Sequence, residues 1–129
     1  MKSEIRKLDW TGFFASLSKR RFEWLTKVEV LKSDLGDQVL TEGLPLNGIT
    51  VEKRGDNITI DISVGENTDS FFTHLIKDPA SVEFVAAFGS HGDIVNIEET
   101  DGTKTLIQFI EPMGIVVGYT EIESISVTA

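Results

Sequence analysis

The chain of 129 residues contains no cysteine. This absence excludes disulfide bonds, zinc sites built on thiolates, iron–sulfur clusters and a cysteine nucleophile. The chain also has no apolar run near the roughly 18 residues that cross a bilayer, and its first ten residues, MKSEIRKLDW, lack the apolar core of a signal peptide. We therefore expect a cytoplasmic protein that is not inserted into a membrane.

Basic residues are scarce, with 12 Lys and Arg against 21 Asp and Glu and a net charge of −9. Because nucleic-acid binding draws most of its affinity from neutralised phosphates, this balance argues against a DNA or RNA partner. The charge is uneven: residues 1–32 hold eight basic and four acidic residues, and residues 33–129 hold four and seventeen. The basic segment is expected to contact the acidic body, with an acidic lipid or protein as the alternative.

Motifs that carry chemistry are absent as well. The sequence contains neither glycine-rich phosphate loop, G-x-G-x-x-G or G-x-x-x-x-G-K-[ST], and no G-x-S-x-G nucleophile turn. The acidic groups at 34–37 and 98–101 do not match the spacing of a calcium-binding EF-hand loop. The sequence therefore predicts no catalytic residue, no metal site and no cofactor.

The first clear pattern is a helix over residues 9–19. Trp10, Phe13, Phe14 and Leu17 follow the i, i+3, i+4, i+7 spacing of one helical face, and Asp9 precedes them as an N-cap. This aromatic face predicts a helix packed on a sheet as a lid, with a membrane-surface helix as the alternative.

Strand patterns follow. Residues 25–30 and 38–42 show extended patterns, and residues 49–51 and 58–64 alternate with period two around Arg54-Gly55-Asp56-Asn57, which predicts a hairpin. The Gly43–Gly48 segment, with Pro45, indicates a bend or a sheet edge.

Beyond residue 66 the period changes. A short helix is expected from Asn67 or Thr68 through Ile76, ended by Asp78-Pro79. A strand over 82–86, a loop over 89–92 and a second hairpin, 94–98 with 105–109, come next. Residues 113–129 are expected as an edge strand or a loose tail.

Together these elements predict a single α+β domain over residues 1–129. An N-terminal helix precedes a strongly bent antiparallel sheet with one short helix inserted mid-chain. The sequence leaves open whether the sheet closes into a small barrel.

Two candidate sites follow from this scheme. On the predicted middle helix, His74 would lie beside Asp78 at i+4 and Ser70 at i−4, in a pocket for a small molecule or a metal. Leu44, Pro45 and Leu46 at the bend could form an apolar patch for a protein partner or a second copy, although such residues are more often core.

Several segments resemble a family of small bacterial proteins of unknown function, found in cyanobacteria and proteobacteria. The matching segments are Asp9-Trp10 with Phe13-Phe14, Val28–Val30, Leu35–Gln38, Leu44–Ile49, His74–Ile76 with Pro79, and Asp101–Thr103. The resemblance spans residues 9–110 and implies a bacterial, cytoplasmic, single-domain protein, but it implies no activity.

The leading functional hypothesis is a non-enzymatic protein-interaction or regulatory module, acting through a protein partner or as a homo-oligomer. The alternative is a protein that binds a small molecule or a metal near His74, with catalysis as one option.

Overall fold

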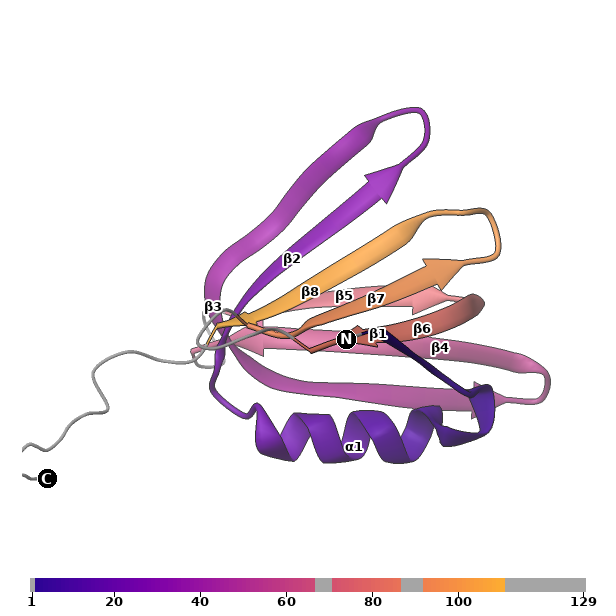
Figure 1. The fold of residues 1–129 in the computed structure, drawn as a ribbon, viewed down its shortest axis with the longest axis horizontal. Helices are drawn as coiled ribbons and strands as arrows, with labels where there is room; N and C mark the ends of the chain where they lie inside the picture. Colours follow the sequence, from indigo (N-terminus) through magenta and orange to yellow (C-terminus); the bar gives the residue numbers. More distant parts are fainter. Residues whose placement is uncertain (1, 67–70, 87–91, 111–129) are drawn as a thin grey trace, which may run out of the picture.

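The computed structural model describes residues 2–66, 71–86 and 92–110. It contains eight strands, one α-helix and a single turn of 3-10 helix (Figure 1). The strands are β1 (Lys2–Ile5), β2 (Leu25–Lys32), β3 (Gly36–Arg54), β4 (Asn57–Gly65), β5 (Phe71–Lys77), β6 (Pro79–Val85), β7 (Ile94–Glu99) and β8 (Lys104–Ile110). The 3-10 turn η1 (Lys7–Asp9) leads into the helix α1 (Trp10–Arg20).

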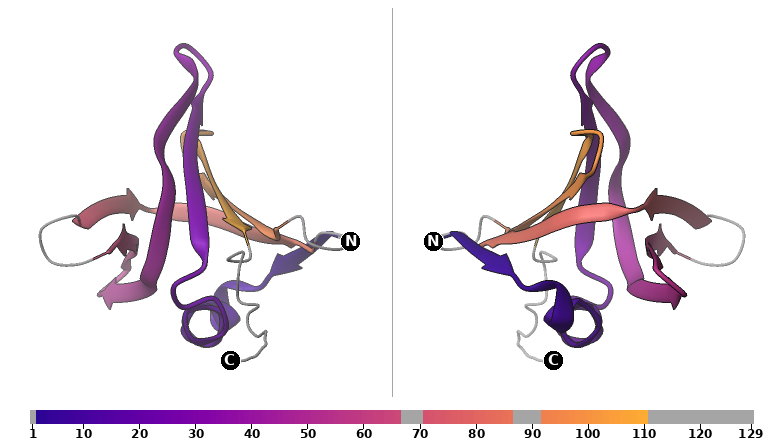
Figure 2. Two further views of the ribbon diagram at one scale, coloured as in Figure 1. Left: turned by 90° about the vertical axis from the view of Figure 1, so that its left-hand side faces the viewer. Right: turned by 90° about the vertical axis from the view of Figure 1, so that its right-hand side faces the viewer.

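All eight strands form one antiparallel sheet in the order β1-β6-β7-β8-β2-β3-β4-β5. Within the described part of the chain the sheet is not closed, and β1 and β5 lie at its two edges. Seen end-on, β3, β4 and β5 form one arm and β6, β7 and β8 the other, while the β2–β3 hairpin rises between them (Figure 2).

The long strand β3 produces this shape. Its first half pairs with β2 from Gly36 to Pro45, and its second half pairs with β4 from Leu46 to Arg54. Irregular register near Thr26–Glu29 of β2, together with Gly43 at a φ of +90°, lets the strand bend between its two partners. The predicted bend over 43–48 is therefore the change of partner within one continuous strand.

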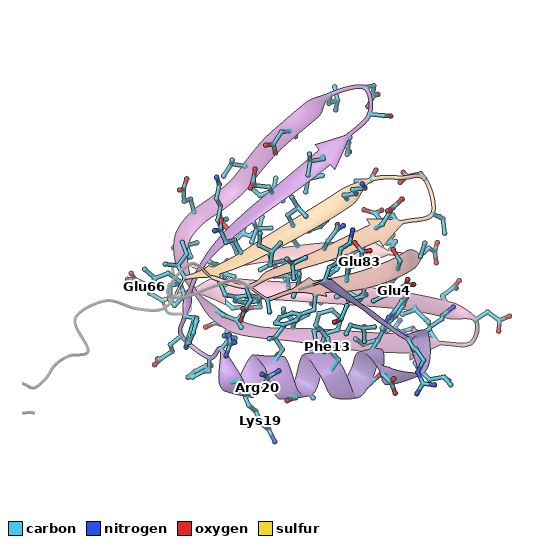
Figure 3. All side chains as sticks on the ribbon, viewed as in Figure 1. Glu4, Phe13, Lys19, Arg20, Glu66 and Glu83 are labelled. Carbon is cyan, nitrogen blue, oxygen red and sulfur yellow. The ribbon has the colours of Figure 1, made fainter. Side chains whose placement is uncertain are left out.

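The helix lies beneath the sheet, between the two arms (Figures 1 and 2). Trp10, Phe14 and Leu17 are fully buried, which fits their helical spacing. Figure 3 shows Lys19 pointing away from the sheet. The expectation of a lid on the sheet is confirmed, and the buried aromatic rings are not available for a membrane surface.

Three contacts attach α1 to different parts of the sheet. The Ser18 hydroxyl donates to the Ile49 carbonyl at 3.2 Å and accepts from the Ile49 amide at 2.9 Å. The Phe13 ring packs edge-on against Phe84 of β6, and the Trp10 indole N–H donates to the Ile5 carbonyl at 2.9 Å. The helix thus joins the β3 arm, the β6 arm and the N-terminal strand.

Three features of the predicted fold are wrong. The domain is an antiparallel β-sheet protein with one α-helix, not an α+β domain that starts with a helix, because β1 precedes α1. The predicted helix ending at Ile76 is instead the strand β5. The Asp9 side chain makes no capping bond and instead accepts from Arg6 Nε at 3.1 Å.

Both predicted hairpins are confirmed as β3–β4 and β7–β8. Residues 89–91 of the predicted loop and the segment 113–129 lie outside the described residues. No helix in the described ranges is long and apolar enough to span a membrane.

Candidate functional site

The edge strand β5 is the candidate site. Its sequence FFTHLIK is rich in aromatic and aliphatic residues, and each residue pairs with β4, from Phe71 opposite Gly65 to Lys77 opposite Thr59. The strand ends at Asp78, which has a φ of +49° and donates its amide to the Ile58 carbonyl at 3.0 Å. This corner directs the chain into β6 in the other arm, so β5 remains an end strand.

Among the strands that the structure describes, none pairs with one long side of β5. In an antiparallel sheet every second residue of an edge strand directs its N–H and C=O groups outward. Over residues 2–66, 71–86 and 92–110, β4 is the only strand paired with β5. The free side of β5 therefore presents a row of backbone donors and acceptors that can pair with another extended chain.

The other edge, β1, is protected in the usual way. It has four residues, two of them charged, and Glu4 lies directly opposite Glu83 of β6 (Figure 3). Lys2 Nζ lies 3.6 Å from the Glu83 carboxylate. Short length and charged side chains discourage unwanted strand pairing. β5 has seven residues, no proline or glycine, no acidic residue and a lysine only at its end.

The side chains of β5 alternate between the two faces of the sheet. Phe71 and Leu75 lie on the outer face and are 53% and 49% exposed. Beside Leu75 the outer face is hollowed by a cavity of about 480 Å³, lined by Glu52, Arg54, Asn57, Thr59, Leu75, Lys77 and Asp78. Apolar side chains and a hollow with polar walls therefore border the free edge.

His74 occupies the centre of β5 on the inner face, opposite Ile62. Burial lowers the pKa of its imidazole, the Asp61 carboxylate opposes that shift, and Lys32 of β2 reinforces it. Its Nε2 atom is buried and has no hydrogen-bond partner among the described residues. The lowered pKa favours the neutral form of the imidazole at the middle of the edge.

Asp61 of β4, which lies opposite Leu75, also has a shifted pKa. Burial raises the pKa of its carboxyl group, the neighbouring Glu52 raises it further, and His74 lowers it. Its Oδ1 atom is buried without a hydrogen-bond partner in the described part of the chain. Asp61 lies opposite Leu75 on the outer face, whereas His74 lies opposite Ile62 on the inner face. The two side chains therefore do not form the hydrogen-bonded pair of a catalytic dyad.

The structure does not bring together the residues of the pocket that the sequence predicted around His74. On a strand, positions four apart are separated by roughly 13 Å, so His74 and Asp78 are not neighbours. Ser70 lies outside the described residues. Because β5 replaces the predicted middle helix, no pocket between that helix and the sheet exists. Within the described ranges no three His, Asp or Glu residues group as metal ligands.

The predicted apolar patch at the bend is largely core. Leu46 is fully buried, and Leu44 and Pro45 are half-buried. The Leu44 carbonyl accepts a hydrogen bond from the Thr26 hydroxyl at 2.7 Å, which ties the bend to β2. The exposed apolar side chains at the site come instead from β5, and its content of aromatic and β-branched residues was the available signal for a strand.

Over residues 2–66, 71–86 and 92–110 the structure is thus an antiparallel β-sheet with one covering helix and one unprotected strand edge. The chain belongs to DUF5335, a family of unknown function whose model matches residues 1–116. An uncharacterised protein of Aquifex aeolicus (strain VF5) is 29% identical over 110 residues, covering 85% of this chain and 82% of that protein. No solved structure shows significant similarity to the chain.

Proposed function

We propose that this protein is a non-enzymatic interaction module that binds an extended polypeptide segment along the free edge of β5. The observation that carries this proposal is the contrast between the two sheet edges. β1 is short and charged, whereas β5 is longer and bears charge only at Lys77. A soluble β-sheet protein ordinarily protects both edges, so an unprotected edge indicates a strand that pairs with a partner.

The surroundings of β5 support the same mode of binding. An added strand gains affinity from backbone hydrogen bonds and specificity from the side chains beside them. Phe71 and Leu75 would contact alternate apolar residues of that strand on the outer face, and the hollow at Leu75 would accept a larger side chain. We place this activity in the cytoplasm, as the cysteine-free sequence favours.

The test uses a phage-displayed library of short linear peptides selected against the wild-type protein. Selected peptides should lose most of their affinity for Leu75→Lys and keep it for Val39→Lys. Val39 is the matched control because its side chain is also 49% exposed and lies on the β2–β3 hairpin. Hydrogen exchange should show new protection of β5 amides in the complex. Peptides that bind Leu75→Lys equally well and leave β5 unprotected would refute the proposal.

The outer-face hollow favours a second candidate function, the binding of a small polar molecule. It holds two cationic side chains, Arg54 and Lys77, with Asn57 and Thr59 between them. This site differs from the predicted pocket near His74, since His74 faces the other side of the sheet. A panel of metabolites that raises the melting temperature of the wild type but not of Arg54→Ala would support it. If no metabolite raised the melting temperature, the interaction module would be the remaining proposal.

A further inference from the structure

We infer that the strand that pairs with β5 is β5 of a second copy of this chain, antiparallel about a two-fold axis beside His74. The inference rests on the proposed function and names its partner. An isologous contact of this kind uses one surface twice, so that surface must be complementary to itself.

The sequence of β5 meets this requirement when His74 faces His74 of the second copy. Phe72 then lies opposite Ile76 on the inner face, and Thr73 opposite Leu75 on the outer face. The terminal pair is Phe71 opposite Lys77, which places a cation beside an aromatic ring. Ile76 is fully buried within its own protomer, so the exposed apolar side chains available to the contact are Phe71 and Leu75 of the outer face. No two like charges face each other in this register.

Charge also selects this edge for self-association. The chain has a net charge of −9, so two copies repel each other over most of their surfaces. Of the two edge strands, β1 carries Glu4 opposite Glu83, whereas β5 carries no acidic residue. Two acidic molecules can therefore approach most closely along β5.

His74 suits the centre of such an interface. Side chains directly opposite each other in an antiparallel pair have Cβ atoms about 4.5–5.5 Å apart. At that spacing the two half-buried His74 side chains meet with no acidic residue of either β5 strand between them. The contact of two seven-residue strands is small, so the dimer should be weak and should form with rising protein concentration.

Cysteine cross-linking tests the register directly, because the chain has no cysteine of its own. Opposite residues have Cα atoms about 4.5–5.5 Å apart, within the range of a disulfide. His74→Cys should therefore form a disulfide-linked dimer under mild oxidation. Thr73→Cys and Leu75→Cys should each cross-link poorly alone but efficiently when mixed. Thr50→Cys, an exposed position on β3, is the control that should not cross-link.

Sedimentation equilibrium of the unmodified chain, from micromolar to millimolar concentration, tests the association without a cross-link. The wild type and Val39→Lys should show the same monomer–dimer equilibrium, and Leu75→Lys should weaken it at least several-fold. Circular dichroism of each variant confirms that the fold is kept, which the exposure of both side chains favours.

The outcomes separate this inference from the proposed function. A chain that stays monomeric at all concentrations, and whose His74→Cys variant does not cross-link, overturns the inference. The proposed function then stands if the selected peptides still protect β5. Self-cross-linking of Thr73→Cys or Leu75→Cys without His74→Cys overturns the His74-centred register. If Leu75→Lys leaves the dimer unaffected, the dimer interface lies outside β5, and this result also overturns the inference.

Discussion

At the scale of single residues, Ser18 has an unusual position for a helical serine. Its hydroxyl both donates to and accepts from the backbone of Ile49, at 3.2 and 2.9 Å. Ile49 lies in the half of β3 that has already left β2, so no described strand pairs with its amide and carbonyl on that side. The Ser18 hydroxyl therefore provides the hydrogen-bond partner for two backbone groups of Ile49 that would otherwise be buried under the helix without one.

We predict that Ser18→Ala lowers the free energy of unfolding by about 1–3 kcal/mol, because both backbone groups of Ile49 lose their partner. Ser16→Ala on the exposed side of the same helix should change it by less than about 0.5 kcal/mol. Urea denaturation followed by circular dichroism measures both. If the two substitutions changed the free energy of unfolding equally, the Ser18 hydrogen bonds would contribute nothing beyond the difference in helix propensity between serine and alanine.

His74 predicts a pH dependence of stability. Burial lowers the pKa of His74 in the folded state, whereas in the unfolded chain it is about 6.5. The unfolded state therefore binds the proton first as pH falls. The contribution of His74 is fully present above the unfolded pKa and is lost as pH drops from there toward the lowered folded pKa.

The measurement compares the unfolding free energy of the wild type with that of His74→Gln, between about pH 7.5 and 5.5. The wild type should lose stability more steeply over this range. Using the difference between the two curves removes the titration of Asp61 to first order, although its coupling to His74 remains. A difference that does not vary with pH would mean that the His74 pKa is not lowered by folding.

At the scale of elements, local patterns determined the hairpins and the helix. Alternation on both sides of Gly55 predicts β3–β4, and the 3.6-residue spacing of Trp10, Phe14 and Leu17 predicts α1. Such signals depend on residues close in sequence, so they can be interpreted without a tertiary structure.

The segment 71–77 shows where local interpretation fails. Phe72 and Ile76 lie four residues apart, which fits a helical face, and they also alternate with period two around His74. A short apolar run satisfies both periods. The segment forms a strand because all seven of its residues pair with β4, and this tertiary pairing outweighs local helix propensity.

For α1, we predict that Phe14→Ala lowers the free energy of unfolding by about 3–5 kcal/mol, because the ring is fully buried beneath the sheet. Phe22→Ala, just beyond the helix, is the matched control, since that ring is 54% exposed and should contribute little. Chemical denaturation of both variants measures the difference. A small loss for Phe14→Ala would mean that the helix does not contribute to the core as one cooperative unit.

At the scale of the whole molecule, charge governs association. Two copies with a net charge of −9 repel each other, and salt screens that repulsion. We predict that the monomer–dimer association constant rises several-fold as salt increases from about 0.05 to 0.5 M. Sedimentation equilibrium at fixed pH measures it. A dimer that weakens with added salt would indicate ion pairs at the interface, which the acid-free β5 strand does not offer.

The sequence by itself determined the covering helix, the two hairpins and the absence of cysteine chemistry, because each depends on composition or on neighbours a few residues apart. Only the tertiary structure decided that β5 is a strand, that it lies at an edge, and that Leu46 belongs to the core. Strand order is set by pairing between residues distant in the chain, such as β2 with β8 and β1 with β6. The unprotected edge, and with it the candidate function, exists only once that order is formed.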